Sequence, residues 1–322
     1  MLYLNEQSIH EIGIDWEKLV DVIEETVKCL GKGDFVQPVK PYLRYRDLKN
    51  RIIAMPAFIG GDFDMAGIKW IASFPDNIHK GIPRAHSVVI LNKAASGEPA
   101  AIINTALLSI IRTAAVSGLM IRYFDKIRPL EKINLGLIGW GPIGRNQLKM
   151  CLDLWGDKIA KIFLYDLRKI EAPAIDFVPQ DKIVVAESWH QAYVDADVFI
   201  TATVSKAPYI DKKPKKGSLH LNVSLRDYTT DTYDYVKDSI IVDDWEEICR
   251  EKTDIEMMHI EKGLKKEDTK SIVDMVMSDC MKDYPADVPI MFNPMGMAVF
   301  DMAVGTYYAR EARRKGLGQE LT

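Results

Sequence analysis

Gly139, Gly141 and Gly144 have the spacing of a nucleotide-binding turn, in the segment NLGLIGWGPIGRNQL at residues 134–148. An apolar run at residues 135–138 precedes them, and a helical pattern follows. Glycine lets a chain turn sharply and lets its amide groups approach a pyrophosphate, whose charge is favoured at the positive end of a helix. The spacing is weak by itself, but the strand before it and the helix after it are the required context. The segment therefore predicts a dinucleotide-binding turn.

An aspartate, Asp166, ends the next apolar run, KIFLYD, 22 residues after Gly144. An acid at this distance can accept hydrogen bonds from the ribose hydroxyls of adenosine. Its charge would repel a 2′-phosphate and so favours NAD over NADP, whereas the nearby Arg168 could accommodate such a phosphate. In the alternative interpretation, Asp166 only caps a turn and the glycines only allow close packing. The acid and the glycine turn together favour NAD.

A lysine, Lys69, stands between Ile68 and Trp70 in the apolar run MAGIKWIASF, residues 65–74. Removing an unpaired ammonium from water costs several kcal/mol, so a lysine in such a run either faces solvent or is held for chemistry. The alternative to chemistry is a side chain that extends to the surface or joins a surface ion pair. The residue types elsewhere in the chain have to decide between these interpretations.

The elements that must position these residues change character along the chain. Residues 15–35, DWEKLVDVIEETVKCLGKGDF, predict a helix with one apolar face, capped by Asp15 and ended by Gly31. Short β-branched and aromatic runs separated by Gly, Pro, Asn and Asp follow as far as residue 104, which is typical of an antiparallel meander. After a helix that contains residues 107–127, strands alternate with helices, as a parallel sheet requires.

We therefore predict an α/β protein of two domains. Residues 1–125 would form an antiparallel α+β domain, and residues 126–297 would form a Rossmann domain that binds NAD. The final helix, within residues 298–322, would pack back on the first domain.

Composition excludes several classes of function. The chain has 322 residues, 48% of them hydrophobic, with 42 basic and 46 acidic residues and a net charge of −4, so it offers no basic footprint for nucleic acid or an anionic membrane. The N-terminal residues lack the pattern of a signal peptide, so we expect a cytoplasmic protein. The four cysteines and six histidines have no ligand spacing, so we expect neither a disulfide nor a metal site.

Segments spread over nearly the whole chain resemble the ornithine cyclodeaminase and mu-crystallin family. In chain order they are GIKWI, SIIRTAAVS, LIGWGPIG, NVSLRDYTTD and NPMGMAVFD. Further segments, among them DFVQPVKPYLR, RIIAMPAFIGG and IVDDWEEICREK, look more like one branch, the 2,3-diaminopropionate biosynthesis dehydrogenases that act on N-(2-amino-2-carboxyethyl)-L-glutamate. The resemblance implies a homodimer that oxidises a secondary amine with NAD, with residues 1–125 as the domain for substrate binding and dimerisation. The products would be 2-oxoglutarate and 2,3-diaminopropionate, a precursor of siderophores and peptide antibiotics.

The resemblance also assigns roles to individual residues. Lys69 matches a lysine that contacts a substrate carboxylate and assists proton transfer, and Asp227 matches an acid that faces the reacting carbon. Arg44 and Arg112 match substrate-binding arginines, with Arg46 as an alternative to Arg44 because both would share one face of a strand. These types suit the chemistry, since arginines offer planar forks for carboxylates and a lysine beside an aspartate can transfer protons. The implied cofactor contacts are Arg112, Gly139, Gly141, Pro142, Ile143, Gly144, Asp166, Thr203, Val204, Ser224 and Met297.

Two positions differ from the wider family and bear on the substrate. Ser109 stands where a threonine is common, and NVSLRD lacks the glycine pair that cyclodeaminases often carry before the aspartate. Both differences disfavour cyclisation of ornithine. The alternatives are an ornithine cyclodeaminase, another imine or amino-acid dehydrogenase of the family, or a non-catalytic, crystallin-like protein that binds NAD(P). The set of charged residues favours an enzyme, because a storage protein needs no acid–base pair.

Overall fold

The computed structural model describes residues 1–322, which form two compact units. The first unit contains Met1–Ala115 and Gly296–Thr322, and the second contains Val116–Met295. The sequence pattern places the first boundary ten residues later, at residue 125. The reason for this difference is that helix α3 (Leu107–Ile127) continues without a break through the division, so composition does not change where the packing changes.

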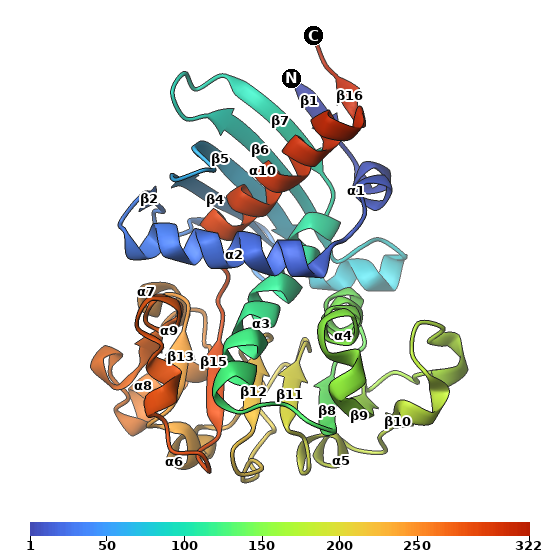
Figure 1. The fold of residues 1–322 in the computed structure, drawn as a ribbon, viewed down its shortest axis with the longest axis vertical. Helices are drawn as coiled ribbons and strands as arrows, with labels where there is room; N and C mark the ends of the chain where they lie inside the picture. The colour runs from blue at the N-terminus through green and yellow to red at the C-terminus, as the bar shows by residue number, and fades with distance from the viewer. The chain divides into compact units, whose positions relative to one another are not determined.

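The first unit is built on an eight-stranded sheet with the strand order β16-β1-β7-β6-β5-β4-β2, in which β3 also pairs with β4. Strands β4 to β7 are antiparallel neighbours in chain order, which is the meander that the sequence predicts. The chain ends meet in this sheet, where β1 pairs with β16 (Figure 1). The bounds of the strands are β1 (Leu2–Leu4), β2 (Phe35–Val36), β3 (Tyr42–Leu43), β4 (Arg51–Ile59), β5 (Met65–Ser73), β6 (Ala85–Lys93), β7 (Pro99–Asn104) and β16 (Gln319–Glu320).

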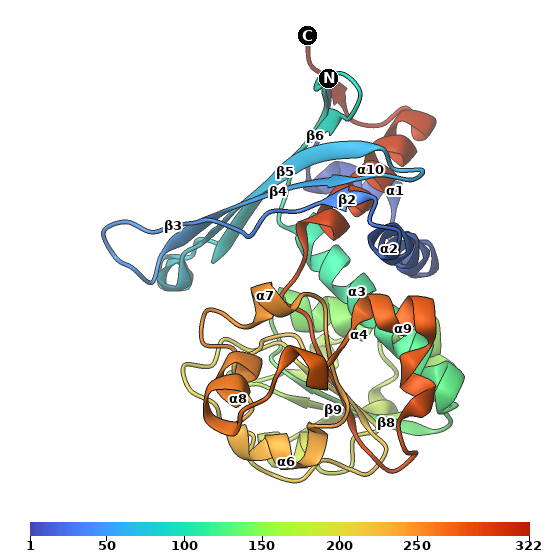
Figure 2. The ribbon, with the colours of Figure 1, turned by 90° about the vertical axis from the view of Figure 1, so that its left-hand side faces the viewer.

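Helices cover one face of this sheet. Helix α10 (Ala298–Lys315) packs on β4, β5 and β6 and also against α1 (Glu6–Ile12) and α2 (Trp16–Gly31), and Figures 1 and 2 show α10 and α2 on the same side of the strands. The Asp15 side chain accepts from Lys18 N and caps α2, as expected. Gly67 permits the close approach of α10, because a Cβ there would lie 2.8 Å from Met302 Sδ and 2.1 Å from Ile90 O. A short 3₁₀ helix, η1 (Pro75–Lys80), follows β5.

The second unit is a parallel eight-stranded sheet with the order β10-β9-β8-β11-β12-β15-β13-β14. The strand order reverses between β8 and β11, and α/β sheets bind ligands beside such a switch point. The strands are β8 (Ile133–Ile138), β9 (Ile159–Tyr165), β10 (Ile183–Val185), β11 (Val198–Thr201), β12 (Leu219–Asn222), β13 (Ile240–Val242), β14 (Lys270–Ser271) and β15 (Ile290–Asn293). The apolar runs KIFLYD, IVVAES, VFITATV, LHLNVS and SIIVDD predict β9 to β13. The two-residue β14, which is too short to carry a pattern, and β15 were not predicted.

Short helices connect these strands. They are α4 (Pro142–Trp155), α5 (Trp189–Tyr193), α6 (Tyr233–Val236), α7 (Trp245–Ile248), α8 (Asp254–Lys262) and α9 (Ile272–Ser278), with 3₁₀ turns η2 (Gly156–Lys158), η3 (Ala172–Ala174), η4 (Gln180–Lys182), η5 (Thr230–Thr232), η6 (Lys266–Asp268) and η7 (Cys280–Asp283). Two of them, α4 and α5, pack on β8. The glycine turn therefore lies between the central strand of this sheet and a helix that packs on it.

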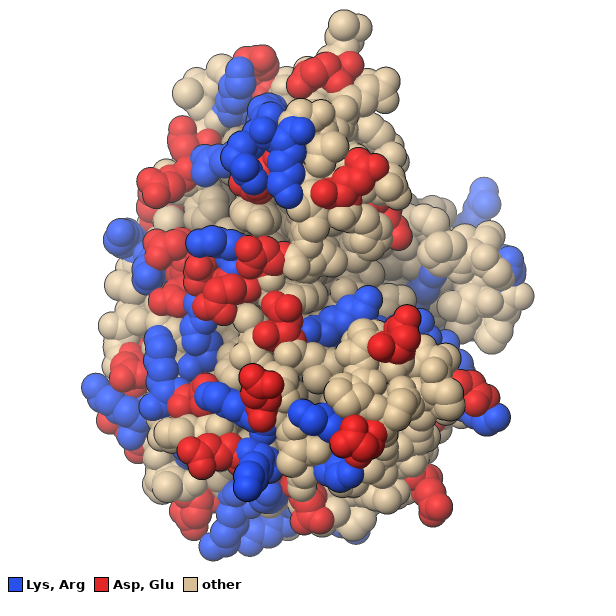
Figure 3. Space-filling view, turned by 45° about the vertical axis from the view of Figure 1, so that its right-hand side comes forward, with Lys and Arg blue, Asp and Glu red and all other residues tan.

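Two surface properties bear on partners. Helix α3 is long and apolar enough to cross a membrane by length and composition, with a mean hydropathy of 1.4, but 78% of its most apolar window is buried inside the protein. This is the burial of a core helix. Acidic and basic side chains are intermingled on the face of the molecule that Figure 3 shows.

Candidate functional site

Lys69 lies on the face of β5 that α10 covers, and its side chain is buried. The residue is 2% exposed, and its Nζ donates to Asp301 Oδ2 at 2.7 Å. Asp301, near the start of α10, is 0% exposed. The neighbour Trp70 points to the opposite face of the strand and is 42% exposed. The lysine in the apolar run is therefore a buried cation held by a buried carboxylate.

The same carboxylate also binds Arg112. Arg112 Nε donates to Asp301 Oδ1 at 3.2 Å, and Ser109 Oγ donates to the same oxygen at 3.2 Å. Ser109 and Arg112 are three residues apart on α3 and so lie on one helical face. Asp301 thus joins a strand and two helices through one carboxylate.

Burial and charge shift the ionisation of this cluster. Burial lowers the pKa of Lys69 to about 7, because it outweighs the attraction of Asp301 and is reinforced by the positive charges of Arg112 and Lys40. Burial alone would raise the pKa of Asp301, but the charges and hydrogen bonds of Arg112 and Lys69 hold it below its ordinary value. Asp301 is therefore a carboxylate at neutral pH, while Lys69 can gain or lose a proton there.

A third buried cation, Lys40, belongs to this part of the first unit. It is 4% exposed, and its Nζ donates to Gly296 O at 2.8 Å. Gly296 has a φ of +90°, and a Cβ at this position would lie 3.0 Å from Arg112 Nη1. The next residue, Met297, is buried and is the N-cap of α10. The segment NPMGM therefore positions both α10 and the Arg112 guanidinium.

Arg44 lies in the loop after β3, where its Nη1 donates to Leu48 O at 2.8 Å and its guanidinium stands 5.5 Å from the centre of the Tyr42 ring. The expectation that Arg44 and Arg46 share a strand face is wrong. Strand β3 ends at Leu43, and Arg46 has a φ of +54°, which no strand residue adopts. The structure joins Lys69 and Arg112 through Asp301, while these contacts of Arg44 are with its own loop.

In the second unit the glycine turn has the geometry that its spacing predicts. Gly139 has a φ of +96°, and a Cβ there would lie 2.4 Å from Ala202 O. A Cβ at Gly144 would lie 1.9 Å from Gly139 O, so neither position accepts another residue without a backbone shift. Gly141, the N-cap of α4, has open space around its missing Cβ, and Pro142 follows at the first helical position. This open space at a helix N-terminus fits the pyrophosphate of a dinucleotide.

Asp166 follows the last residue of β9 and is tied to the glycine turn. Its Oδ2 accepts from Trp140 N at 2.7 Å, and its Oδ1 accepts from Arg168 N at 2.8 Å and Arg168 Nε at 3.2 Å. Burial would raise the pKa of Asp166, but the hydrogen bonds from Arg168 and Trp140 lower it overall. Asp166 is therefore ionised, and Arg168, the residue that could favour NADP, is its ion-pair partner.

Three further predicted residues meet in the second unit. Asp227 is 0% exposed, and its carboxylate accepts from Thr203 Oγ1 at 2.5 Å and from Ser224 Oγ. Val204, next to Thr203, is 64% exposed. Ile143, in the glycine turn, is 37% exposed. Asp227 is thus a hydrogen-bonded carboxylate beside the ends of β11 and β12.

A buried network beneath Asp227 fixes its loop. Asp254 Oδ2 accepts from Asn222 Nδ2 at 2.9 Å and from the backbone N–H groups of Asp227 and Tyr228 at 3.2 Å each. Burial raises the pKa of Asp254 to about 7 in spite of these hydrogen bonds. The loop also contains Leu225 at a φ of +66°, an uncommon conformation for leucine that the Asn222 side chain supports by accepting from Leu225 N.

Sequence reasoning missed Asp301, Lys40 and Asp254. Asp301 carried a usable signal, since an aspartate within the apolar run MAVFDMAVG is the acidic counterpart of the lysine in MAGIKWIASF. A buried charge on one element requires an opposite charge on another. Asp254 had no such signal, because it follows Thr253 at a helix start, where an acidic residue is common.

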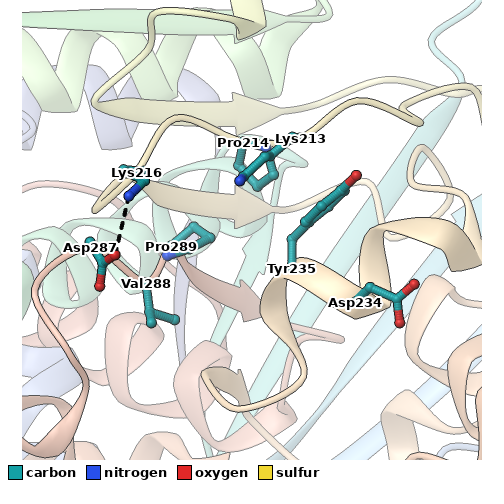
Figure 4. A pocket seen from close by; sticks show the side chains of 8 residues that line it. All are labelled: Lys213, Pro214, Lys216, Asp234, Tyr235, Asp287, Val288 and Pro289. Carbon is teal, nitrogen blue, oxygen red and sulfur yellow. Dashed lines mark hydrogen bonds and ion pairs between the residues drawn. The ribbon is translucent and has the colours of Figure 1, made fainter.

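Other parts of the molecule offer less chemistry. No group of three or more His, Cys, Asp or Glu side chains is arranged to hold a metal ion, and all four cysteines are free. A surface pocket of about 260 Å³ in the second unit contains none of the predicted residues (Figure 4). Its lining includes the exposed Lys213 and Lys216, of which Lys216 pairs with Asp287 at 3.4 Å.

Comparisons with known proteins show the family and the fold of the chain. Residues 3–316 match the ornithine cyclodeaminase/mu-crystallin family. The chain is 34% identical over its full length to the N-((2S)-2-amino-2-carboxyethyl)-L-glutamate dehydrogenase of Staphylococcus aureus, 98% of which is covered. Two solved structures share the fold over the whole chain: the Δ1-pyrroline-2-carboxylate reductase of Thermococcus litoralis with NADH and L-proline (TM-score 0.87, 21% identity, all of that chain covered), and an archaeal alanine dehydrogenase dimer with NAD (TM-score 0.84, 22% identity, 99% covered). These relatives are dehydrogenases and reductases, and the chain belongs to the ornithine cyclodeaminase/mu-crystallin family.

Proposed function

We propose that the protein is an NAD-dependent dehydrogenase that converts N-(2-amino-2-carboxyethyl)-L-glutamate and water into 2,3-diaminopropionate and 2-oxoglutarate. The observation that carries the proposal is the buried cluster of Lys69, Arg112 and Asp301, because it holds a lysine whose pKa is lowered to about 7, where an amine can accept and release protons at neutral pH. The full-length identity of 34% to the Staphylococcus aureus enzyme supports the choice of substrate.

The residues of the two units indicate which unit would bind the cofactor and which would bind the substrate. The second unit would be the Rossmann domain that holds NAD, with the pyrophosphate at Gly141 and the adenosine ribose at Asp166. The first unit, including its C-terminal helix, would bind the substrate. Bound NAD supplies the acceptor for the hydride that leaves the glutamate α-carbon. Arg112, Thr203, Val204, Ser224 and Met297 are proposed as further cofactor contacts, together with Pro142 and Ile143 of the glycine turn.

The chain's own groups would bind carboxylates and move protons. Arg112 has an Nη1 nitrogen on the side of Gly296, beyond the Nε that Asp301 engages, and its fork suits a substrate carboxylate. Neutral Lys69 would take the proton that the secondary amine releases, since its pKa lies near 7. Asp227 would face the reacting carbon. Water then adds to the imine carbon, and the C–N bond breaks to give the ketone of 2-oxoglutarate and the amine of 2,3-diaminopropionate.

The charge of the first unit favours a polyanionic substrate. Two cations, Lys40 and Arg112, are buried there with the titrating Lys69 and the one carboxylate of Asp301. The proposed substrate brings three carboxylates, whereas ornithine brings one carboxylate and a second ammonium that these cations would repel. Arg44 is proposed as an outer carboxylate contact in the exposed loop after β3.

The uncovered face of the first unit's sheet supports a homodimer. On this face, β5 and β6 present two pairs of apolar neighbours, Ile68 with Ile90 and Trp70 with Val88. Along each strand these residues alternate with buried residues that face α10. These residues are partly exposed, and contiguous exposed apolar surface marks an interaction site. A second copy of this chain is the proposed occupant, and Trp70→Lys should then convert a dimer into a monomer in light scattering.

We further propose that the enzyme acts in the cytoplasm, where its four free cysteines would stay reduced, and supplies 2,3-diaminopropionate to siderophore or peptide antibiotic biosynthesis. Product analysis by mass spectrometry, together with NADH formation, tests the activity with the amino-acid conjugate N-(2-amino-2-carboxyethyl)-L-glutamate, ornithine, alanine and proline at equal concentrations. Products must be measured because conversion of ornithine to proline and ammonia gives no net NADH. The conjugate should give the highest kcat/KM. A preference for ornithine, with ammonia and proline as products, would instead support a cyclodeaminase. Binding of NAD(P) without turnover of any amine would support a crystallin-like protein.

A further inference from the structure

Asp301 uses both of its oxygens on two different cations. Oδ2 accepts from Lys69, while Oδ1 accepts from Arg112 and from Ser109. Asp301 is 0% exposed, so these contacts lie in the core of the first unit. Removing one member of a buried ion pair leaves the other charge uncompensated, which is far more costly than losing a surface pair. Lys69 and Arg112 therefore both depend on Asp301.

Asp301 is the acid that acts most strongly on Lys69. The direct neighbours of the lysine across the sheet are the apolar Met55 on β4 and Val89 on β6. The charged groups with the largest effect on it are Asp301 from α10, Arg112 from α3 and Lys40 from the loop before β3. Two of these three groups are positive, so the charged form of the lysine depends on Asp301.

The backbone fixes where Asp301 stands. Gly67, two residues before Lys69 on the same face of β5, lets α10 approach the strand, because any Cβ would meet Met302 Sδ at 2.8 Å. Met302 is the residue after Asp301. At the other side, Gly296 admits the Arg112 guanidinium, with 3.0 Å between the position of a Cβ and Nη1. Two glycines thus hold the carboxylate between its partners.

We propose that Asp301 is a positioning residue for the proposed reaction, which sets the protonation of Lys69 and the orientation of Arg112 through one carboxylate. This inference rests on the proposed function for its kinetic consequences, but its effect on Lys69 exists without substrate. A purely structural ion pair would also shift the protonation of Lys69, but it would leave KM and the pH dependence of kcat/KM unchanged. The titration therefore measures the effect of Asp301 on Lys69, and the kinetics separate the two roles.

The test compares Asp301→Asn with Ser109→Ala in protein labelled with ¹⁵N at the lysine Nζ atoms. Asparagine keeps the shape and an acceptor oxygen but removes the charge, whereas Ser109→Ala removes one hydrogen bond to Asp301 and leaves the charge in place. NMR titration of the free protein should place the Lys69 midpoint near pH 7 in the wild type and at least one pH unit lower in Asp301→Asn. Ser109→Ala should stay within half a unit of the wild type. Equal midpoints in all three proteins would overturn the proposal.

Kinetics give a second readout on the same proteins. In Asp301→Asn, the pH at which kcat/KM for the conjugate reaches half of its plateau should fall together with the Lys69 midpoint. The KM should rise about tenfold or more, because Arg112 loses the carboxylate that orients it. If Asp301→Asn does not fold, Asp301→Glu keeps the charge but displaces it by one methylene, and a higher KM with an unchanged Lys69 midpoint is expected. An unchanged KM in that variant would contradict the positioning of Arg112. Failure of the wild type to oxidise the conjugate would remove the proposed function, while the titration would still decide the role of Asp301.

Discussion

Lys69 and Asp301 are 232 positions apart in the chain, and a hydrogen bond of 2.7 Å joins them in the core of the first unit. The lysine belongs to the middle of a sheet and the aspartate to the first turn of the last long helix. Because both groups are removed from water, the charge of each offsets the desolvation cost of the other. The pair explains how a strand of apolar residues can contain an ammonium, and it places a titrating amine where the proposed chemistry needs one.

Replacing Lys69 by alanine should lower kcat for the conjugate by about 10² or more, which is the range for loss of a general acid or base. The affinity for NAD should change less than twofold, since the glycine turn and Asp166 belong to the other unit. Steady-state kinetics and a fluorescence titration with NADH measure the two quantities. Lys69→Arg is the matched control for charge, because arginine keeps the cation but does not deprotonate in this range. Near-normal turnover in either variant would exclude Lys69 as the base.

The pH dependence of kcat/KM should show an ionisation near pH 7. Burial lowers the pKa of Lys69 to about 7, and only the neutral amine can accept a proton, so activity should rise as the pH increases through this value. Asp301, whose pKa is lowered, remains ionised throughout this range. The rise should be absent from the residual activity of Lys69→Ala. A profile that falls between pH 6 and 8 would contradict the assignment of Lys69 as base.

NAD should be preferred over NADP because Asp166 is ionised and would repel a 2′-phosphate. Asp166→Ala should narrow the ratio of the two kcat/KM values by about tenfold or more. Arg168→Ala, which removes the ion-pair partner but keeps the carboxylate, should leave the preference in place. Equal kcat/KM with both cofactors in the wild type would show that Asp166 does not discriminate between a 2′-hydroxyl and a 2′-phosphate.

A buried histidine should make stability depend on pH. Burial lowers the pKa of His220 to about 3, so the unfolded chain binds a proton near pH 6.5 that the folded protein does not accept until about pH 3. The contribution of His220 to stability is therefore present above pH 6.5 and is lost as the pH falls. Asp254, with its pKa raised to about 7, acts in the opposite direction, because the folded form takes up its proton first.

A difference measurement separates these effects. The free energy of unfolding of the wild type minus that of His220→Gln should decrease from pH 7 to pH 4, as urea titrations at each pH would measure. Ser218 Oγ donates to Lys215 O, so it accepts from His220 Nε2, and Tyr228 O–H then donates to Nδ1. Glutamine can replace part of this chain without titrating. A constant difference across this range would show that His220 has the same pKa in the folded and the unfolded protein, and would contradict its lowered pKa.

The local patterns of the sequence were sufficient for the fold. The glycine turn, its strand and the acid at the end of the next strand lie within about thirty residues, and each constrains the others through short-range geometry. The meander was predictable because its strands follow one another with turn residues between them. Strand β15 was missed, because its four residues enter the sheet between β12 and β13 from a distant part of the chain.

The candidate site was only half predictable. Lys69 stood out as a charge in an apolar run, and Arg112 was assigned by resemblance to the family. Their common partner Asp301 comes from the C-terminal helix, and no periodic pattern connects residues that far apart. The proton-transfer partner expected for Lys69 was Asp227, yet the aspartate that contacts it within its own unit is Asp301. Which opposite charges meet is a result of tertiary packing, here of α10 against β5 over Gly67.

The most direct test of the proposed reaction follows the hydrogen on the glutamate α-carbon. The purified protein is incubated with NAD and N-(2-amino-2-carboxyethyl)-L-glutamate carrying deuterium at that carbon, and all products are analysed by mass spectrometry. Equal amounts of 2-oxoglutarate, 2,3-diaminopropionate and deuterated NADH are predicted. Absence of 2-oxoglutarate and 2,3-diaminopropionate, together with conversion of ornithine to proline and ammonia, would contradict the proposal.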